Sequence, residues 1–224
     1  MADHNLFKQF QTPYKGELTL KQNRIVETAI RLFAEKGYSN TSTAEIAKAA
    51  EVSEASIFKN YGTKEKLLLS LIVPNLKEIF PSKIDKVLSQ FNSETSFETF
   101  LKAFLMNRNE FISENKEIFQ ILVKELFYNE ELKSDLLPYI SEVVTPRLSA
   151  LIESAKQRGE LIDLPTDRIR TTFMTYIGGF FASHFVLLNK PSISEEEIED
   201  ALRLMMDGFR KTSTPNELLS DIKS

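Results

Sequence analysis

The 224-residue chain contains no cysteine and no tryptophan, and it has only two histidines, His4 and His184. The absence of cysteine excludes disulfides, thiol catalysis and cysteine-ligated zinc. Helical di-metal enzymes bind their metals with Glu-x-x-His pairs, and neither histidine follows a glutamate at that spacing. Because no other catalytic constellation is evident, we expect no metal, no other cofactor and no enzymatic activity.

The sequence also lacks a long apolar run and an apolar N-terminal segment. A membrane-spanning helix needs about 20 mostly apolar residues, and a secretory signal peptide begins with a shorter apolar core. We therefore expect a cytoplasmic protein. Hydrophobic residues make up 42% of the chain, no internal repeat is present, and no alternating run is long enough to indicate a strand. These features predict an all-α fold.

The first stretch with helical periodicity runs from Leu18 to Lys36, and Gly37 marks its end. Its apolar residues recur at the spacing that places them on one face, and they are Ile25, Ala29, Leu32 and Phe33. Residues 1–17 lack such a stripe and are expected to form a flexible arm. An arm of this kind can also lay Lys8 or Lys15 along DNA.

Two short helices are expected next, separated by a tight turn. Ser42 or Thr43 can cap the first, with Glu45 in capping-box register to Ser42. Ser53 is expected to cap the second, whose buried side carries Ile57 and Tyr61. This arrangement indicates a DNA-reading helix-turn-helix. The side chains left on outer faces are Ser53, Glu54, Ala55, Ser56, Phe58, Lys59 and Asn60.

Residues Leu20 to Leu71 resemble the N-terminal domain of the TetR/AcrR repressors. The matching residues are Gly37-Tyr38, Thr41-Ser42-Thr43, Ile46-Ala47, Val52-Ser53, Phe58, Tyr61 and Lys64. The resemblance implies a repressor that binds double-stranded DNA as a homodimer and is released from a pseudo-palindromic operator by a ligand. It assigns phosphate contact, or support of that contact, to Thr41, Ser42, Thr43, Tyr61 and Lys64. Helix capping by Thr41 to Thr43 and core packing of Tyr61 are the structural alternatives.

The chain departs from the family pattern at four positions. Glu51 and Ala55 stand where the family often has glycine, and Phe58 stands where a tyrosine often contacts phosphate. Glu54, in the first turn of the reading helix, repels phosphate but can accept a hydrogen bond from a cytosine amino group. We interpret Glu54 either as a determinant of specificity or as a residue that disfavours binding to other sequences.

The net charge of −4 is distributed unevenly. The stretch from Lys15 to Lys66 has nine basic and seven acidic residues, whereas the chain from Leu67 onward has 18 basic and 24 acidic residues. The small basic excess predicts DNA affinity that depends on a few contacts and on dimerisation, with a moderate salt dependence.

We divide the chain into an arm (1–17), a helix-turn-helix domain (18–66) and a helical regulatory and dimerisation domain (67–224). In the last of these, helices are expected from Lys64 into Pro74, over 96–113, over 118–127 and over 130–158 with interruptions near Pro138 and Pro146. The two final helices are expected at 166–188 and 194–211.

The penultimate helix is apolar nearly all round, so another surface must cover it. In the family, the last two helices pack against their copies. Here Gly178, Gly179, Ala182 and Ser183 permit close crossing. Leu202, Met205, Met206 and Phe209 are expected to add a stripe from the last helix.

Phenylalanine is abundant, and 13 of 17 lie from Phe80 onward. An aromatic cavity for a small hydrophobic or amphipathic ligand and simple core packing both fit this excess. Candidate ligand-binding residues are Phe104, Arg108, Tyr128, Tyr176 and His184, although His184 also suits a structural role. The alternative to a ligand-controlled regulator is a DNA-bound helical scaffold that recruits protein partners without an inducer.

Overall fold

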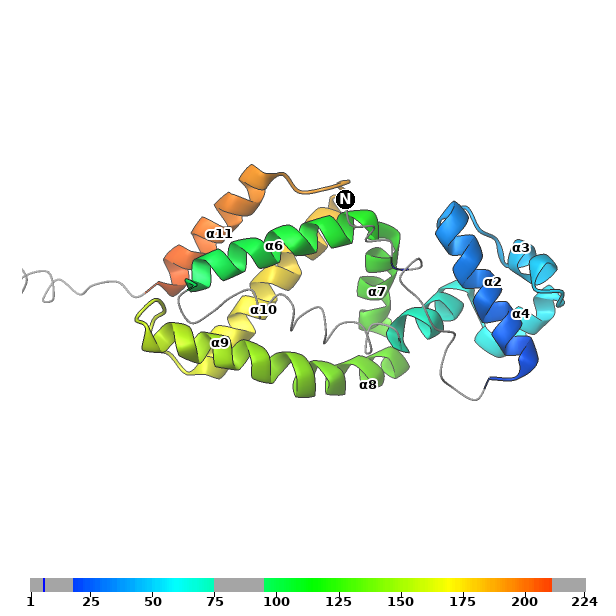
Figure 1. Cartoon of the computed structure of the whole chain (residues 1–224), viewed down its shortest axis with the longest axis horizontal. Coiled ribbons are helices and arrows are strands. Elements are labelled where there is room, and N and C mark those ends of the chain that lie inside the picture. Colours follow the sequence, from blue (N-terminus) through cyan, green and yellow to red (C-terminus); the bar gives the residue numbers. More distant parts are fainter. Residues whose placement is uncertain (1–5, 7–17, 75–94, 211–224) are drawn as a thin grey trace, which may run out of the picture.

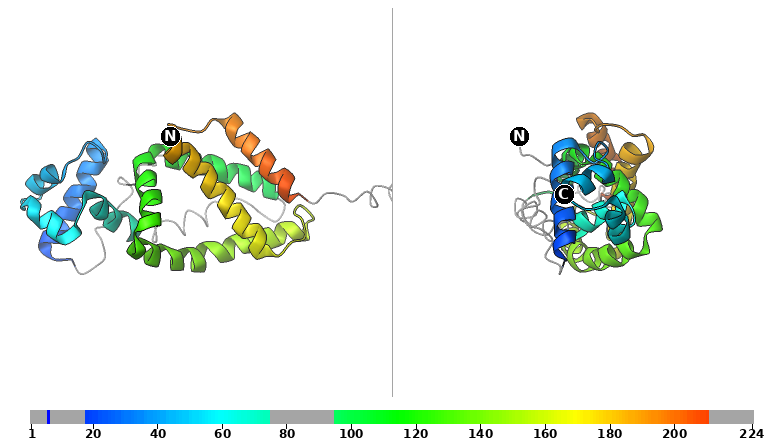
Figure 2. Two further views of the ribbon diagram at one scale, coloured as in Figure 1. Left: turned by 180° about the vertical axis from the view of Figure 1, so that it is seen from behind. Right: turned by 90° about the vertical axis from the view of Figure 1, so that its right-hand side faces the viewer.

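The computed structural model describes Leu6, residues 18–74 and residues 95–210. Within these residues the fold is all-α, apart from an isolated bridge between Leu161 and Arg210. A small head made of α2, α3 and α4 lies at one end of the elongated molecule, and the other helices form the body (Figures 1 and 2). Within the described ranges, no helix combines the length and the apolar character that crossing a membrane requires.

Capping residues set the first two helices of the head. Thr19 and Gln22 form a capping box at the start of α2 (Leu20–Lys36), and Gly37 ends the helix at a φ of 81°. The expected box of Ser42 and Glu45 is present at the start of α3 (Thr43–Ala49). The sequence therefore predicted the start of α3 and the end of α2 from local chemistry, whereas the box at Thr19 was not predicted.

The turn between α3 and α4 (Glu54–Tyr61) is closed by two backbone hydrogen bonds. Glu51 donates to Lys48 over 3.3 Å and Val52 donates to Ala47 over 3.0 Å, which is the Schellman arrangement. Glu51 adopts a φ of 55°, where glycine is usual. The expected hydroxyl cap by Ser53 is wrong, because Ser53 Oγ lies 2.7 Å from Ser56 Oγ and makes no cap hydrogen bond.

The head is packed directly against the body. The helix that begins at Lys64, described as far as Pro74, contributes buried leucines and isoleucines to the head's core. Ile118 of α7 (Lys116–Tyr128) belongs to the same cluster, as does Leu6. Leu6 also donates its backbone N–H to Oδ1 of the buried Asn115 over 3.0 Å. The rest of the predicted arm and any bend beyond Pro74 lie outside the described residues.

The body contains the remaining helices. They are α6 (Phe97–Glu114), α7, α8 (Glu130–Tyr139), α9 (Thr145–Gln157), α10 (Thr166–Ala182) and α11 (Glu195–Phe209), with π-helical segments at Ile140–Val144 and Ser183–Leu187. The α-helix expected over 130–158 is interrupted near Pro138 and Pro146, as predicted: α8 ends at Tyr139, and α9 begins at Thr145. The π-helical segment Ile140–Val144 lies between them, and the residues at its ends keep right-handed helical dihedrals. The interruption is therefore a change in hydrogen-bond pattern rather than a loop.

Five phenylalanines fill the core of the body and contact one another. Phe97 and Phe173 lie 5.7 Å apart between ring centroids, and Phe181 and Phe185 lie 6.3 Å apart. Phe100 is buried in the same cluster. For these side chains, the packing explanation of the phenylalanine excess is the correct one.

The expected apolar stripe of α11 also faces this core. Leu202, Met205 and Met206 are buried within the protomer, against the helices that include α6. Assigning them to a dimer surface was therefore wrong. The outward side of α11 instead carries Leu204, which is 67% exposed.

Replacing Glu51 by glycine should stabilise the protein, because a non-glycine residue in the left-handed region costs roughly 1 kcal/mol. Glu51→Ala is the matched control, since it removes the exposed 3.6 Å ion pair with Arg24 but keeps the strained backbone. We expect urea unfolding to give Glu51→Gly about 1 kcal/mol more stability than Glu51→Ala. Equal stabilities of the two variants would contradict this account of the turn.

Candidate nucleic-acid interface

Helix α4 presents an exposed outer face at the far end of the head (Figure 1). Ser53, Glu54, Ala55, Lys59 and Asn60 are exposed on or beside it. The side chain of Phe58 is also 48% exposed, which leaves an apolar ring available for contact with base edges or methyl groups. Ser56 is buried at 9%, so its assignment to the reading face is corrected.

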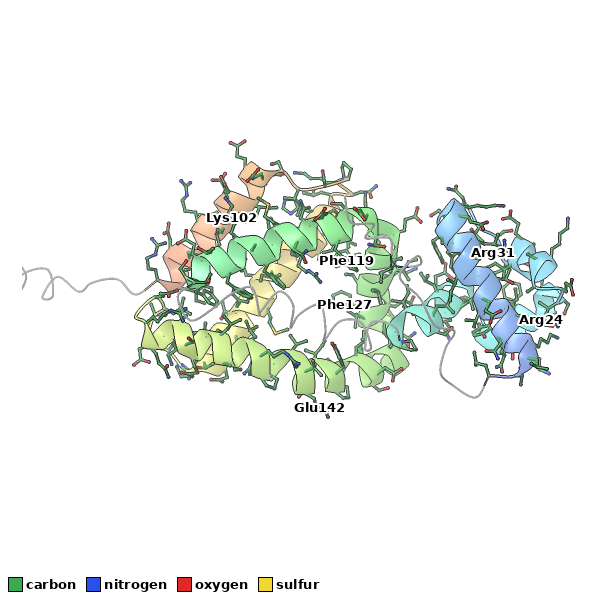
Figure 3. The ribbon with its side chains drawn as sticks, viewed as in Figure 1. Arg24, Arg31, Lys102, Phe119, Phe127 and Glu142 are labelled. Atoms are coloured by element: carbon green, nitrogen blue, oxygen red, sulfur yellow. The ribbon has the colours of Figure 1, made fainter. Side chains whose placement is uncertain are left out.

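The basic residues of the head differ in how strongly they are engaged. Arg24, which extends from α2 (Figure 3), lies 3.6 Å from Glu51, and Lys36 lies 2.9 Å from Glu45. Both are exposed pairs, which are worth about 0–1 kcal/mol and are easily exchanged for phosphate. Lys59 is exposed and forms no ion pair with any residue that the structure describes.

The amide of Asn60 is held by its surroundings. Its Nδ2 donates to the carbonyl of Ser56 over 2.6 Å, and its Oδ1 accepts from Gln22 Nε2 over 3.4 Å. A bidentate contact to adenine requires both groups to be free. In this arrangement Asn60 ties α4 to α2 rather than extending toward a groove.

Two residues expected to contact phosphate have structural roles. Thr41 is 1% exposed, and its hydroxyl lies 2.9 Å from the Gly37 carbonyl, so direct contact is excluded. The ammonium of Lys64 donates to the carbonyls of Tyr38 and Thr41, each over 2.8 Å, and lies 4.0 Å from the Tyr38 ring centroid. Burial lowers the pKa of Lys64. Both residues thus hold the loop before α3, which is the supporting role that the sequence left open. The position of Tyr61, half-buried against the head core, fits the same role.

Three polar residues gather where α3 and α4 begin. The hydroxyl of Ser42 accepts from the Glu45 N–H over 3.1 Å. The hydroxyl of Thr43 donates to Glu54 Oε1 over 2.6 Å. A carboxylate therefore lies at the N-terminal ends of two helices, where the helix dipoles favour its negative charge.

The five candidate ligand-binding residues do not form one site. Tyr128 is 82% exposed at the end of α7. The Tyr176 hydroxyl donates to the Ala201 carbonyl over 3.1 Å, and His184 Nδ1 lies 2.8 Å from the Phe180 carbonyl. Those two side chains connect elements of the body, which is the structural alternative that the sequence had offered for His184.

Phe104 and Arg108 lie together on α6. The Arg108 guanidinium carbon is 5.9 Å from the Phe104 ring centroid and 5.2 Å from that of Phe111. Burial lowers the pKa of Arg108. A cation placed between aromatic rings suits an anionic group at the end of an apolar molecule.

A cleft of about 420 Å³ lies between the head and α8. It is lined by Asn60 and Tyr61 of α4, by Lys66 and Leu69 of the following helix, and by Leu132 and other residues of α8. Sequence reasoning missed this cleft because its walls come from two segments, residues 60–74 and 129–135, that are far apart in the sequence. Hydrophobic periodicity and capping motifs involve neighbouring residues, so they do not predict a contact between distant segments.

A second feature that the sequence did not reveal is a link between the head and α7. The backbone N–H of Ser39 donates to Glu117 Oε2 over 3.1 Å. Burial raises the pKa of the neighbouring Tyr38, and the carboxylates of Glu65 and Glu117 raise it further. The loop that precedes α3 is thus fixed both to the head and to the body.

A family model matches the part of the chain that carries this geometry. The model described as "Bacterial regulatory proteins, tetR family" matches residues 25–71, which span most of α2, all of α3 and α4 and much of the next helix. Over these residues the chain is similar to the TetR family. The match covers the head and its connection to the body, which is where the candidate interface lies.

Proteins similar to this chain include two regulators of Bacillus subtilis (strain 168). The HTH-type transcriptional regulator YuxN is 33% identical over 123 residues, covering 55% of this chain and 38% of YuxN. The chain thus matches less than half the length of that relative. The HTH-type transcriptional regulator YvkB is 27% identical over 192 residues, covering 83% of this chain and 95% of YvkB.

A solved structure extends the similarity through the body. Thermus thermophilus FadR, a TetR-family transcriptional repressor in complex with lauroyl-CoA, superposes with a TM-score of 0.52 at 24% identity. The superposition covers 87% of this chain and 97% of that one. At this identity, the similarity shows a shared fold that extends through the helical body.

Lys59 and Lys64 should behave differently when each is replaced by methionine. Lys59→Met removes an exposed charge, so DNA affinity should fall by about 1 to 3 kcal/mol and its salt slope by about 1. Lys64→Met leaves two carbonyls without their donor, so the protein should lose about 1 to 3 kcal/mol of stability while the salt slope is kept. Fluorescence anisotropy across a salt series and urea unfolding measure the two quantities. A reduced slope in Lys64→Met would contradict its structural role.

Proposed function

We propose that this chain is a transcription regulator that binds a pseudo-palindromic operator as a homodimer and acts as a repressor. The observation that carries the proposal is the exposed outer face of α4, held at the end of the head by capping, by the Schellman turn and by the Lys64 bridge. The names of YuxN, YvkB and FadR, all regulators of transcription, support it. The same names favour regulation over catalysis.

The exposed side of the last helices supports dimerisation. Leu187, Leu188 and Leu204 are 80%, 62% and 67% exposed. A Cβ built on Gly178 or Gly179 would meet no atom within 4 Å, so the protomer's own packing does not require glycine there. Glycine in a helix costs roughly 1 kcal/mol relative to alanine, and close approach of a second copy explains why it is present. A twofold arrangement would place two α4 helices in successive major grooves, about 34 to 36 Å apart.

We propose further that a small amphipathic ligand controls DNA binding. The lauroyl-CoA bound to FadR supports this class of compound, and Arg108 beside Phe104 supplies a cation next to an aromatic surface. The ligand would act by favouring a spacing of the heads that does not fit the operator. Of the earlier candidates, only Phe104 and Arg108 are retained for this role.

The division of the chain remains part of the proposal: an arm over 1–17, a DNA-binding domain over 18–66 and a regulatory and dimerisation domain over 67–224. The shared cluster of Ile118 with the head core supports mechanical coupling between the last two.

Selection from random duplex DNA tests the function. We expect the purified chain to enrich an inverted repeat, because a twofold dimer reads the same half-site twice. Adding dodecanoate or lauroyl-CoA during selection should reduce the enrichment if an amphipathic ligand releases DNA. Recovery of unbiased sequences would overturn the proposal, and enrichment that no such compound alters would favour the scaffold function.

Replacing Leu204 by glutamate should weaken the dimer, because a charge would be buried in an apolar contact. Leu137→Glu on α8 is the matched control, since Leu137 is 57% exposed. Analytical ultracentrifugation should show an increase of at least about tenfold in the dissociation constant of the Leu204→Glu dimer, with the control unchanged. A dimer of unaltered strength would place the interface elsewhere.

A further inference from the structure

Glu54 is the first residue of α4, and its exposed carboxylate lies at the start of the helix that presents the reading face. The carboxylate is not free to rotate, because Thr43 Oγ1 donates to its Oε1 over 2.6 Å. This distance is typical of a hydroxyl bonded to a charged acceptor. Among the described residues Oε2 accepts no hydrogen bond, so one oxygen is anchored and the other is available.

The surroundings disfavour a phosphate as the partner of this oxygen. Glu45, in the first turn of α3, bonds to the Ser42 N–H and forms an ion pair with Lys36, so that basic residue is already engaged. A DNA phosphate beside the available oxygen would meet the negative charge of Glu54 itself. A donor group would be attracted instead, and the donors exposed in the major groove are the amino groups of cytosine and adenine.

Cytosine fits better than adenine. The amino group of adenine adjoins N7, which is an acceptor and repels a carboxylate, whereas an amide can satisfy both groups. Cytosine presents its N4 amino donor without an acceptor of its own beside it in the groove. A carboxylate at Glu54 therefore selects cytosine and rejects adenine.

We propose that Glu54 reads a cytosine in each operator half-site and that Thr43 is the positioning residue that holds its carboxylate ready. The proposal rests on the proposed function as a dimeric operator-binding protein. Because the Thr43 bond orders the long side chain before DNA arrives, less conformational entropy is lost on binding. Thr43 thereby acts on specificity through Glu54 rather than through a phosphate.

The test is selection from random duplex DNA with the full chain and four variants: Glu54→Gln, Glu54→Ala, Thr43→Val and Thr43→Ser. The original chain should enrich an inverted repeat with cytosine at one position of each half-site. Glu54→Ala should lose the preference there, by about tenfold, and keep the others. Glu54→Gln, nearly the same size, should change the preference from cytosine to adenine.

The Thr43 variants separate positioning from general structural support. Thr43→Val should reduce discrimination at the cytosine position about threefold while the other positions keep theirs, and Thr43→Ser should restore it. A uniform loss of affinity in Thr43→Val would overturn the positioning role. Thermal unfolding of each variant confirms that folded proteins are compared.

The failures of the two proposals are distinguishable. If the original chain enriches an inverted repeat and Glu54→Ala enriches the same one, Glu54 does not read a base and only this inference fails. If the original chain enriches no repeat, the proposed function fails first.

Discussion

The apolar cluster shared by the head and α7 is the constraint on which the rest of the architecture depends. Ile118 reaches this cluster from the body, and the helix that begins at Lys64 supplies Leu67, Leu68, Leu71 and Ile72. A second contact runs through Leu69, Val73 and Leu132, which join that helix to α8. The orientation of α4 is thus set by packing on two body helices. Any movement of α7 or α8 must change the position of the reading face.

Polar side chains around the head are mostly engaged with one another. Lys64 bonds to two carbonyls, Asn60 bonds to Ser56, and Thr43 bonds to Glu54. These hydrogen bonds within the protein hold the surface in one conformation. They also leave fewer groups for direct contact with DNA, because a donor that is already hydrogen-bonded gains little free energy from bonding to a phosphate instead. The surface that remains available is small, and its chemistry is set by Lys59, Phe58 and Glu54. A protein with a net charge of −4 needs that selectivity, since general attraction to DNA is weak.

Much of the fold followed from local rules in the sequence. The capping box at Ser42 and the glycine stop at Gly37 depend on neighbours within a few positions, and both are present. Pro138 and Pro146 likewise marked where the α-helix is interrupted, but the π-helical form of the segment between them was not predictable from residue type. The roles of Lys64, Thr41 and the Met205 stripe depend on contacts across the whole fold. The residue types showed which interactions these side chains can make, but not whether they lie in the core or on the DNA-facing or dimer surface.

The contact between Leu6 and Asn115 bears on where the boundaries of the DNA-binding domain lie. Leu6 is 3% exposed within the head's own core, and Asn115 fixes its backbone from the junction of α6 and α7. Six buried side chains of this core therefore originate outside residues 18–66, and they are Leu6, Leu67, Leu68, Leu71, Ile72 and Ile118. A fragment cut at those limits would leave the core open. The module visible along the sequence and the unit that folds cooperatively are two different pieces of this polypeptide.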